Sequence, residues 1–316
     1  MVIIFMFPGQ SSRYPGMLDR LIERHAGGRQ ILEVACDVLG RNLFAHYAKA
    51  DGGFDTNQDI QVGVFLANAI QASWLASEGI TPALSLGLSL GEYNHLVDIG
   101  AFSLESAIRL VDLRGQIYDQ GPAGKMAAVS VLRREELLPA VSKASRSGLI
   151  EIANINSPTQ HVIGGEAAAV DDALEILEQE YFVTATVIEH KIPMHTSLFA
   201  GVAAAFAPQL AKVDFQRGHR PYISNYVGGK SAVADAPGIR AMLEAHVHNP
   251  VLWRQCIEEQ AAATPDAVFI EVGPRSVLTN LLTRRWLPHR ALKTDCSPAE
   301  LPLLLTTLRQ LGAQSV

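Results

Sequence analysis

Apolar residues occur along this chain in two kinds of block, short continuous runs and longer segments with helical spacing. Over the first 121 residues the runs predict buried strands at 2–7 and 83–89, and the spaced segments predict helices at 62–79, 91–102 and 104–121. Ser103 is a suitable N-cap for the last of these helices. Because strands alternate with helices, we expect a mainly parallel sheet covered on both faces.

From Met126 the pattern changes to strand, helix, strand, strand, helix, strand. The segments are 126–132, 134–145, 149–156, 161–165, 167–181 and 183–192. This order is the signature of a ferredoxin-like unit. We therefore expect an α/β fold in which residues 1–125 and 193–316 form a large domain and residues 126–192 an inserted small subdomain. A cleft between the two parts is the expected ligand site.

After residue 192 the pattern returns to the elements of the large domain. Helices are expected at 195–213, 239–263 and 276–286, a strand with a turn at 221–229, and a strand at 267–274. Pro250 should break the second of these helices into two. The segment 267–274 is the last buried strand that the pattern predicts.

Composition excludes several classes of function. Hydrophobic residues make up 48% of the chain, but no run of about 18 apolar residues suggests a membrane span. The net charge of −6 gives no general attraction to nucleic acid or to an anionic membrane. No basic segment precedes the first apolar run and no small-residue cleavage site follows it, so we expect a cytoplasmic location.

Three cysteines, Cys36, Cys256 and Cys296, lie far apart in the sequence. Their spacing matches no metal-ligand pattern, and an odd number leaves one of them unpaired. We therefore expect reduced, buried thiols, with no bound metal and no bound cofactor.

Ser89 is the first candidate for chemistry, because it lies between Gly87 and Gly91 where a predicted strand meets a predicted helix. Small neighbours allow the sharp turn on which a nucleophilic serine projects its hydroxyl, and the helix N-terminus supplies amides for an oxyanion. A glycine-bearing turn with an incidental serine fits the same five residues. The pentapeptide by itself leaves both interpretations open.

A nucleophilic serine needs a base, which is usually a histidine. Among the ten histidines, His195 follows a strand and a proline at the junction of the two predicted domains, where the cleft is expected. His95 should point away from Ser89 on the intervening helix. The remaining early candidates have no comparable context: His25, His46, His161 and His219.

An ordinary α/β-hydrolase has its acid and then its histidine after the serine, with the histidine late in the fold. No histidine beyond His195 lies in a loop after a late strand, because His246 and His248 fall in a helical segment and His289 in the tail. The ordinary hydrolase interpretation is therefore weakened.

Eight separated motifs resemble one family in their order along the chain. They are FPGQ, GLSLGE, LRG, ANINSPTQ, PMHTSLF, SNYVGG, NPVLW and EVGPRSVLTNLL. The family is that of malonyl-CoA:acyl carrier protein transacylases and the acyltransferase domains of polyketide synthases. The resemblance extends from Phe7 to about Leu282, and it implies an α/β-hydrolase-like large domain with an inserted ferredoxin-like subdomain.

The resemblance implies a catalytic dyad without a carboxylate. Ser89 is the implied nucleophile and His195 the implied general base. The backbone carbonyl of His246 would hold His195, and the amides of Gln10 and Leu90 would form an oxyanion hole. Two fixed N–H dipoles of this kind stabilise the charge that develops on a thioester oxygen.

Arg114, in the motif LRG, is the implied clamp for the free carboxylate of a malonyl group. A guanidinium matches a carboxylate in two parallel hydrogen bonds, and a buried arginine without an anion would be costly. The alternative is a surface arginine on an amphipathic helix, as we expect Arg109 to be. The other implied substrate contacts are Gln61, Asn156, Met194 and Phe199.

The implied substrate is malonyl-CoA, and the implied partner is an acyl carrier protein with its phosphopantetheine arm. Coenzyme A and carrier proteins are both anionic, so we expect a local basic patch at the mouth of the cleft. The arginines to look at first are Arg13, Arg275, Arg284 and Arg285.

Several positions depart from the usual family pattern. Among them, Leu88 replaces a histidine before the nucleophile, Met194 precedes the base, and Phe199 replaces a common methionine. These departures favour a free-standing, trans-acting acyltransferase of a polyketide or related assembly line over a housekeeping fatty-acid enzyme. Two alternatives stay open. One is an acyl hydrolase or carrier-to-carrier transferase for non-malonyl groups, and the other is a catalytically silent carrier-docking module.

Overall fold

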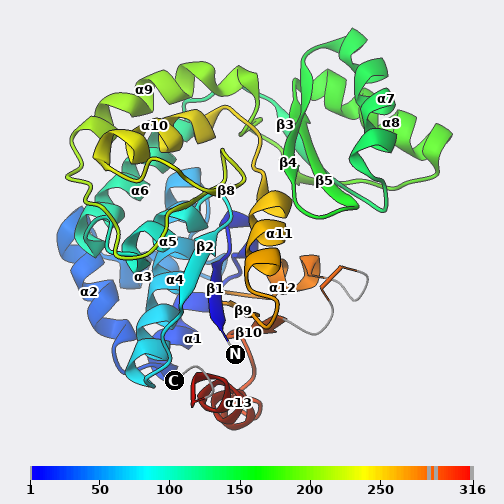
Figure 1. Ribbon diagram of the computed structural model, residues 1–316. Helices are drawn as coiled ribbons and strands as arrows, with labels where there is room; N and C mark the ends of the chain where they lie inside the picture. The colour runs from blue at the N-terminus through cyan, green and yellow to red at the C-terminus, as the bar shows by residue number, and fades with distance from the viewer. Residues whose placement is uncertain (1, 283–285, 288–290, 314–316) are drawn as a thin grey trace.

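The large part of the chain is built on a four-stranded parallel sheet, in a computed structural model that describes residues 2–282, 286–287 and 291–313 (Figure 1). The strand order is β10-β9-β1-β2, and neighbouring strands are parallel throughout. The strands are β1 (Ile3–Phe7), β2 (Leu84–Gly87), β9 (Val268–Glu271) and β10 (Ala291–Lys293). All five residues of β1 are buried, as expected of an interior strand with both faces covered.

Successive side chains of β1 point to opposite faces of this sheet, and each face has its own helices. Ile4 and Met6 pack with α11 (Trp253–Ala263) and α12 (Val277–Leu281). On the other face, Ile3, Phe5 and Phe7 pack with α4 (Asn57–Ser77) and α13 (Leu301–Ala313). The predicted parallel sheet with helices on both faces is thus confirmed.

Further helices form a thick apolar layer around α4, and their buried residues belong to one cluster. They are α1 (Met17–Arg24), α2 (Gly28–Leu39), α3 (Leu43–Tyr47), α5 (Gly91–Asp98), α6 (Leu104–Tyr118), α9 (Ala200–Ala211) and α10 (Ala236–Val247). By length and composition α4 could cross a membrane, but 72% of its most apolar window is buried inside the protein. Its hydropathy is therefore that of a core helix.

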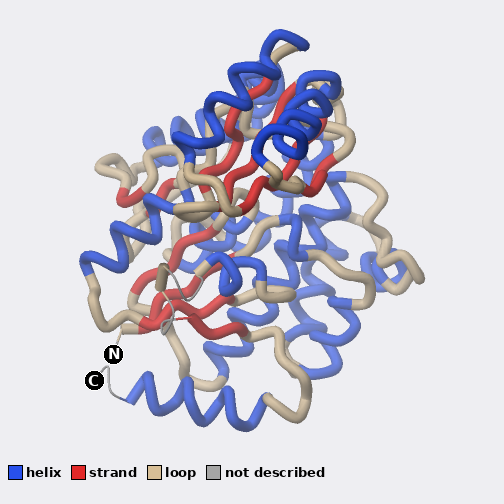
Figure 2. Tube along the Cα trace, turned by 90° about the vertical axis from the view of Figure 1, so that its right-hand side faces the viewer, coloured by secondary structure: helices blue, strands red, loops and turns tan. Residues whose placement is uncertain are grey.

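A second sheet, antiparallel and with strand order β4-β5-β3-β6, stands beside the first (Figure 2). Its elements are β3 (Lys125–Ser130), α7 (Arg134–Ala144), η2 (Ser145–Ser147), β4 (Ile150–Ile155), β5 (Gln160–Gly165), α8 (Ala167–Tyr181) and β6 (Thr186–Glu189). α7 and α8 cover one face, where Ala127 and Val129 are buried with them. Met126 and Ala128, which alternate with these residues, line a cavity on the other face. The predicted fold class, α/β with a ferredoxin-like part, is confirmed.

Some elements differ from the sequence prediction. β10, α13 and the helices α1 to α3 lie in segments for which the sequence analysis predicts no element, and a strand of three residues is also too short to show a period. The strand with a turn expected at 221–229 is a hairpin of two short strands, β7 (Ile223–Ser224) and β8 (Gly229–Lys230). The helix expected from His195 begins later, with η3 (Ser197–Phe199), so His195 lies in a loop. The domain boundaries at residues 126 and 192 stay a prediction.

Two glycines bring the end of β2 into direct contact with the start of α5 and the end of β1. A Cβ atom added at Gly87 would lie 2.0 Å from the backbone of Gly91. One added at Gly91 would lie 2.0 Å from the carbonyl oxygen of Phe7. Real Cβ atoms do not approach backbone atoms so closely, so the turn that carries Ser89 requires glycine at both positions.

The substitution Gly91→Ala should therefore lower the free energy of unfolding by about 3 kcal/mol, since the backbone of β1 or α5 would have to move. Gly201→Ala is the matched control, because Gly201 lies in the first turn of α9 and an added Cβ there meets nothing within 4 Å. That control should be neutral or stabilising by up to about 1 kcal/mol. Urea unfolding of both variants tests the prediction, and equal stabilities would contradict it.

Candidate active site

Ser89 lies at the tip of the turn between β2 and α5 in a strained conformation. Its φ angle is +51°, in the left-handed region that residues other than glycine rarely adopt. The side chain of Asn225 braces this turn: its Oδ1 accepts a hydrogen bond from the Ser89 amide at 2.8 Å, and its Nδ2 donates to the Gly87 carbonyl at 2.7 Å. A strained turn held from outside in this way is typical of a nucleophile elbow.

The structure brings His195 to Ser89 from 106 positions further along the chain. The Ser89 Oγ atom lies 2.7 Å from His195 Nε2, and His195 Nδ1 lies 2.8 Å from the backbone carbonyl of His246. Because a carbonyl only accepts hydrogen bonds, Nδ1 carries the proton and Nε2 presents its lone pair to the serine hydroxyl. This is the tautomer that a general base needs.

The surroundings of His195 keep its ring neutral. The side chain is buried, and burial is the largest cause that lowers its pKa well below the ordinary value. The nearby His246 and Arg114 lower the pKa further, whereas the hydrogen bond to the His246 carbonyl raises it. The imidazole is therefore unprotonated at neutral pH and able to accept a proton.

A cavity of about 580 Å³ opens over Ser89 and His195. One wall comes from the turns at the ends of β1 and β2, and the other from the exposed faces of β3 and β5 in the small sheet. The cleft expected between the two parts of the chain thus lies over the candidate nucleophile. Five of the predicted site residues line it: Gln10, Ser89, Asn156, Met194 and His195. The other five do not line it: Gln61, Leu90, Arg114, Phe199 and His246.

Arg114 is deeply buried on α6, with an exposed fraction of 1%. Its Nη1 donates to Gln61 Oε1 at 2.5 Å, and its guanidinium carbon lies 4.2 Å from the Tyr118 ring centroid and 5.3 Å from that of Tyr93. Phe199 packs edge-on against Tyr118 at 5.3 Å. Among the described residues no carboxylate pairs with Arg114, and its Nε has no hydrogen-bond partner. The alternative of a surface arginine is therefore wrong for this residue.

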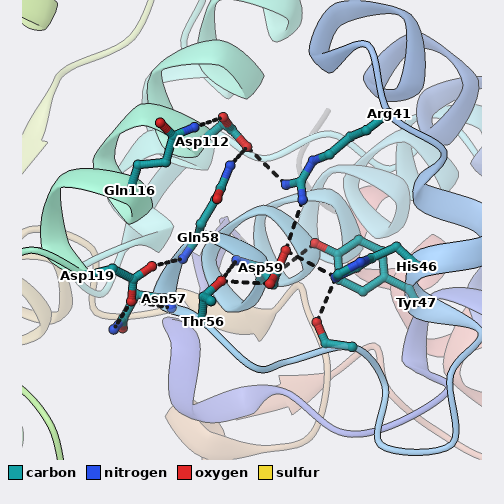
Figure 3. Close-up of polar contacts among 11 residues, drawn as sticks. Arg41, His46, Tyr47, Thr56, Asn57, Gln58, Asp59, Asp112, Gln116 and Asp119 are labelled. Carbon is teal, nitrogen blue, oxygen red and sulfur yellow. Dashed lines mark hydrogen bonds and ion pairs between the residues drawn. The ribbon is translucent and has the colours of Figure 1, made fainter.

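A polar network fixes α6, which carries Arg114, against α4, which carries Gln61 (Figure 3). Arg41 bridges the two helices, with contacts of 2.9 Å to Asp59 of α4 and 3.0 Å to Asp112 of α6. Asp119, just after α6, accepts from the Asn57 amide at the start of α4 at 2.8 Å. These contacts hold α6 against α4, and so they fix the position of the Arg114 guanidinium relative to the side-chain amide of Gln61.

The two amides expected to form an oxyanion hole come from the segments that follow β1 and β2. Gln10 begins η1 (Gln10–Ser12) after β1, and Leu90 precedes α5. Neither amide donates a hydrogen bond to another residue in the part of the chain that the structure describes. The Gln10 side chain donates to Asn57 Oδ1 at 3.3 Å, which orients this loop. Asn156, across the cavity, donates to Gln160 Oε1 at 2.8 Å.

The early histidines considered as candidate bases lie away from Ser89. His95 Nδ1 lies 2.9 Å from Ser85 Oγ and His95 Nε2 accepts from the Ile223 amide at 2.9 Å, so it points away from Ser89 as predicted. None of the early candidates lines the cavity: His25, His46, His161 and His219. His289 lies outside the described residues.

The remaining expectations have mixed outcomes. Arg13 lines the cavity. Burial is the largest cause that lowers its pKa; Glu189 raises this pKa, and the nearby Arg275 lowers it. Arg284 and Arg285 lie outside the described residues. All three cysteines are free thiols, and Cys256 and Cys296 are buried, whereas the expectation of burial is wrong for the half-buried Cys36. No group of side chains suited to a metal ion occurs among the residues that the structure describes.

Sequence reasoning missed three parts of this site. Asn225 lies in the quoted motif SNYVGG, but nothing in that motif predicts contact with the serine turn. Tyr118 follows Arg114 by one helical turn, which is a usable signal, whereas Tyr93 comes from another helix. Glu92 is fully buried and paired with the His246 side chain, and no spacing rule connects these two residues.

Comparison with known proteins agrees with this geometry. A family model described as "Acyl transferase domain" matches residues 4–301. The malonyl CoA-acyl carrier protein transacylase of Bacillus subtilis (strain 168) is 30% identical over 315 residues, which are 98% of this chain and 98% of the relative. The acyl-carrier-protein S-malonyltransferase of Burkholderia pseudomallei 1710b is 30% identical with a TM-score of 0.88, over 97% of this chain and 100% of the other.

A solved complex is also similar. It contains a malonyl-transacylase bound to a type II PKS acyl-carrier protein, and its matched chain is 27% identical with a TM-score of 0.86, over 97% of this chain and 100% of the other. These matches extend over nearly all of the sequence, including the segments that form the serine turn and the histidine loop. The chain therefore belongs to the acyl transferase domain family.

Proposed function

We propose that this protein transfers a malonyl group from malonyl-CoA to the phosphopantetheine thiol of an acyl carrier protein, through an ester on Ser89. The relatives named above are malonyl transferases, and one similar structure is bound to an acyl-carrier protein. No cofactor is required, because serine and histidine supply both the nucleophile and the proton transfer.

One observation carries the choice of acyl group, the buried guanidinium of Arg114. In the part of the chain that the structure describes, the partners of this charge are a neutral amide and two aromatic rings, and its exposed fraction is 1%. Such a buried charge is costly unless an anion joins it. The free carboxylate of malonate is such an anion, and it can take two parallel hydrogen bonds from the guanidinium. Neutral acyl groups would leave the charge uncompensated.

The first half-reaction forms the acyl-enzyme. Ser89 Oγ attacks the thioester carbon while His195 Nε2 takes the hydroxyl proton, and the His246 carbonyl steadies the imidazolium through Nδ1–H. The amides of Gln10 and Leu90 bind the oxyanion, and each such donor contributes roughly 2.7–4 kcal/mol. The attack gives a tetrahedral intermediate. When this intermediate collapses, the carbon–sulfur bond breaks, and His195 returns the proton to the leaving thiol of coenzyme A.

The second half-reaction is the reverse with another thiol. The phosphopantetheine thiol gives its proton to His195 and attacks the Ser89 ester, and the serine leaves with the same proton. Met194 and Asn156 border the acyl group in the cavity, while Gln61 and Phe199 act behind it by supporting Arg114. Arg13 meets the phosphates of either substrate at the mouth.

Several finer points belong to the same proposal. The protein acts in the cytoplasm as a free-standing, trans-acting enzyme of a polyketide or related assembly line. Residues 1–125 and 193–316 form the acyltransferase domain, and residues 126–192 the ferredoxin-like subdomain. The hydrolase and carrier-to-carrier alternatives are not favoured, because the similar proteins named above are malonyl transferases.

Incubation with malonyl-CoA should add one malonyl mass to the protein, measured by intact-protein mass spectrometry. The adduct should be absent in Ser89→Ala, because Ser89 Oγ is the hydroxyl that lies within hydrogen-bond distance of His195 Nε2. Addition of a phosphopantetheinylated carrier protein should then move the mass to the carrier. If the adduct is lost equally fast with and without carrier protein, water is the acceptor, and this result would favour the hydrolase alternative.

Replacement of Arg114 by Ala should lower kcat/KM for malonyl-CoA by about 30- to 1,000-fold, since two charge-assisted hydrogen bonds contribute roughly 2–4 kcal/mol together. Acetyl-CoA should be used no worse than before. Arg109→Ala is the matched control, because Arg109 is exposed on the same helix and should have less than a twofold effect. An unchanged preference for malonyl-CoA in Arg114→Ala would disprove the clamp.

The pH dependence of acyl-enzyme formation should reflect the lowered pKa of His195. A histidine with the ordinary pKa of about 6.5 would be only about one quarter neutral at pH 6. Because burial first, and then His246 and Arg114, lower this pKa, the single-turnover rate at pH 6 should stay within about twofold of that at pH 7.5. A rate that falls with a midpoint at or above pH 6.5 would contradict the neutral, buried base.

A further inference from the structure

His246 has a second group near the base, its own imidazole ring, to which the mechanism above gives no role. The residue lies in the last turn of α10 with an exposed fraction of 2%. Its ring stacks on that of His195, with centroids 4.8 Å apart and an angle of 24° between planes. The backbone carbonyl would be present with any residue at this position, whereas the stacked ring is specific to histidine here.

The His246 ring is itself held by a buried acid. Its Nδ1 lies 3.0 Å from Glu92 Oε2, and Glu92 has an exposed fraction of 0%. The Tyr222 hydroxyl donates to the other oxygen of Glu92, and the Asn225 amide donates to Oε2 at 3.4 Å. A buried carboxylate requires such donors, so the Nδ1–H of His246 completes the set. The Nε2 atom of His246 has no partner among the described residues.

The same acid is connected to the nucleophile. Asn225, whose amide donates to Glu92, also binds the amide of Ser89 and the carbonyl of Gly87 through its side chain. Glu92 therefore lies between two branches, one that reaches the serine turn through Asn225 and one that reaches the base through His246. If Asn225 or His246 were displaced, the distance between Ser89 Oγ and His195 Nε2 would change.

The hydrogen bond from His195 to the His246 carbonyl does not by itself prevent rotation of the His195 ring. A single hydrogen bond to His195 Nδ1 sets the direction of that bond, but the imidazole can still rotate about it, and such rotation swings Nε2 away from Ser89 Oγ. A parallel ring at 4.8 Å blocks this rotation by contact. Displacement of a reacting atom by about 1 Å can cost about a hundredfold in rate.

We propose that the imidazole of His246, held by Glu92, is a positioning residue that keeps the His195 base in line with Ser89. This inference rests on the proposed function only in that Ser89 and His195 react together. It is independent of which acyl group or acceptor the protein uses.

The ring has an electrostatic consequence that a merely structural side chain would lack. The charged or titratable groups that act on His195 are His246 from α10 and Arg114 from α6, and both lower its pKa after burial. The groups around Glu92 are Tyr222, whose pKa is raised by burial and then by Glu92, and Cys256, whose pKa rises for the same reasons. Removal of the His246 ring should therefore raise the pKa of His195.

The test uses the whole protein and phenylmethanesulfonyl fluoride, a reagent that needs no acyl specificity. Ser89 Oγ forms a bond to sulfur, the sulfur–fluorine bond breaks, fluoride leaves and His195 takes the serine proton. The second-order inactivation rate is measured from pH 5 to 8 for wild type, His246→Ala, His246→Gln and His248→Ala. His248→Ala is the matched control, because His248 lies at the same helix end, and the described residues include no hydrogen bond or ring stacking between it and the dyad.

We expect His246→Ala to react about 10- to 100-fold more slowly per folded molecule, with the acid limb of its pH profile moved to higher pH. His246→Gln keeps an N–H donor for Glu92 and should fold normally, yet lose about tenfold in rate with the same shift. His248→Ala should stay within twofold of wild type.

A wild-type rate and a wild-type acid limb in His246→Gln would overturn the inference, even if His246→Ala fails to fold. An equal loss of rate in His248→Ala would also overturn it, because the helix end and not the ring would then control the base. Thermal unfolding of each variant reports the folded fraction. Failure of malonyl loading in the wild type with normal sulfonylation would refute the proposed function and leave this inference intact.

Discussion

The site depends on one close contact between backbones, where Gly87 and Gly91 bring β2, α5 and β1 together. At these distances no side chain fits, so the chain must reverse within a few residues and Ser89 takes a left-handed conformation. The turn places the serine hydroxyl at the cavity, within hydrogen-bond distance of His195. It also costs conformational energy, which the side chain of Asn225 offsets by binding the backbone on both sides of the serine.

Buried charge is the second feature that organises the molecule. Arg114 and Glu92 have exposed fractions of 1% and 0%, on different helices near His195. Glu92 has its donors within the protein, whereas Arg114 has a neutral partner and aromatic faces among the described residues. A charge that the fold satisfies contributes to structure, and a charge that it leaves uncompensated is available to a ligand. This difference separates the positioning acid from the proposed carboxylate clamp.

The residues of the site were not equally predictable from the sequence. Ser89, His195 and Arg114 have motifs around them, so the sequence could identify them as candidates. The contact between His195 and the His246 carbonyl was implied by resemblance, and the structure has it at 2.8 Å. Asn225, Tyr93 and the Glu92–His246 pair could not be found, because each contact joins segments whose spacing in sequence carries no rule. β10 was missed because a strand of three residues is too short to show a period.

By itself the sequence determined the alternation of strands and helices, the antiparallel unit between them and the glycines around Ser89, because these follow from local periodicity and backbone sterics. Only the tertiary structure decided that Arg114 is buried with no carboxylate partner among the described residues, that its helix is clamped to α4, and that the His246 ring stacks on His195. These properties depend on distances between segments far apart in the chain. Such distances are set by packing of the whole core, and no local pattern encodes them.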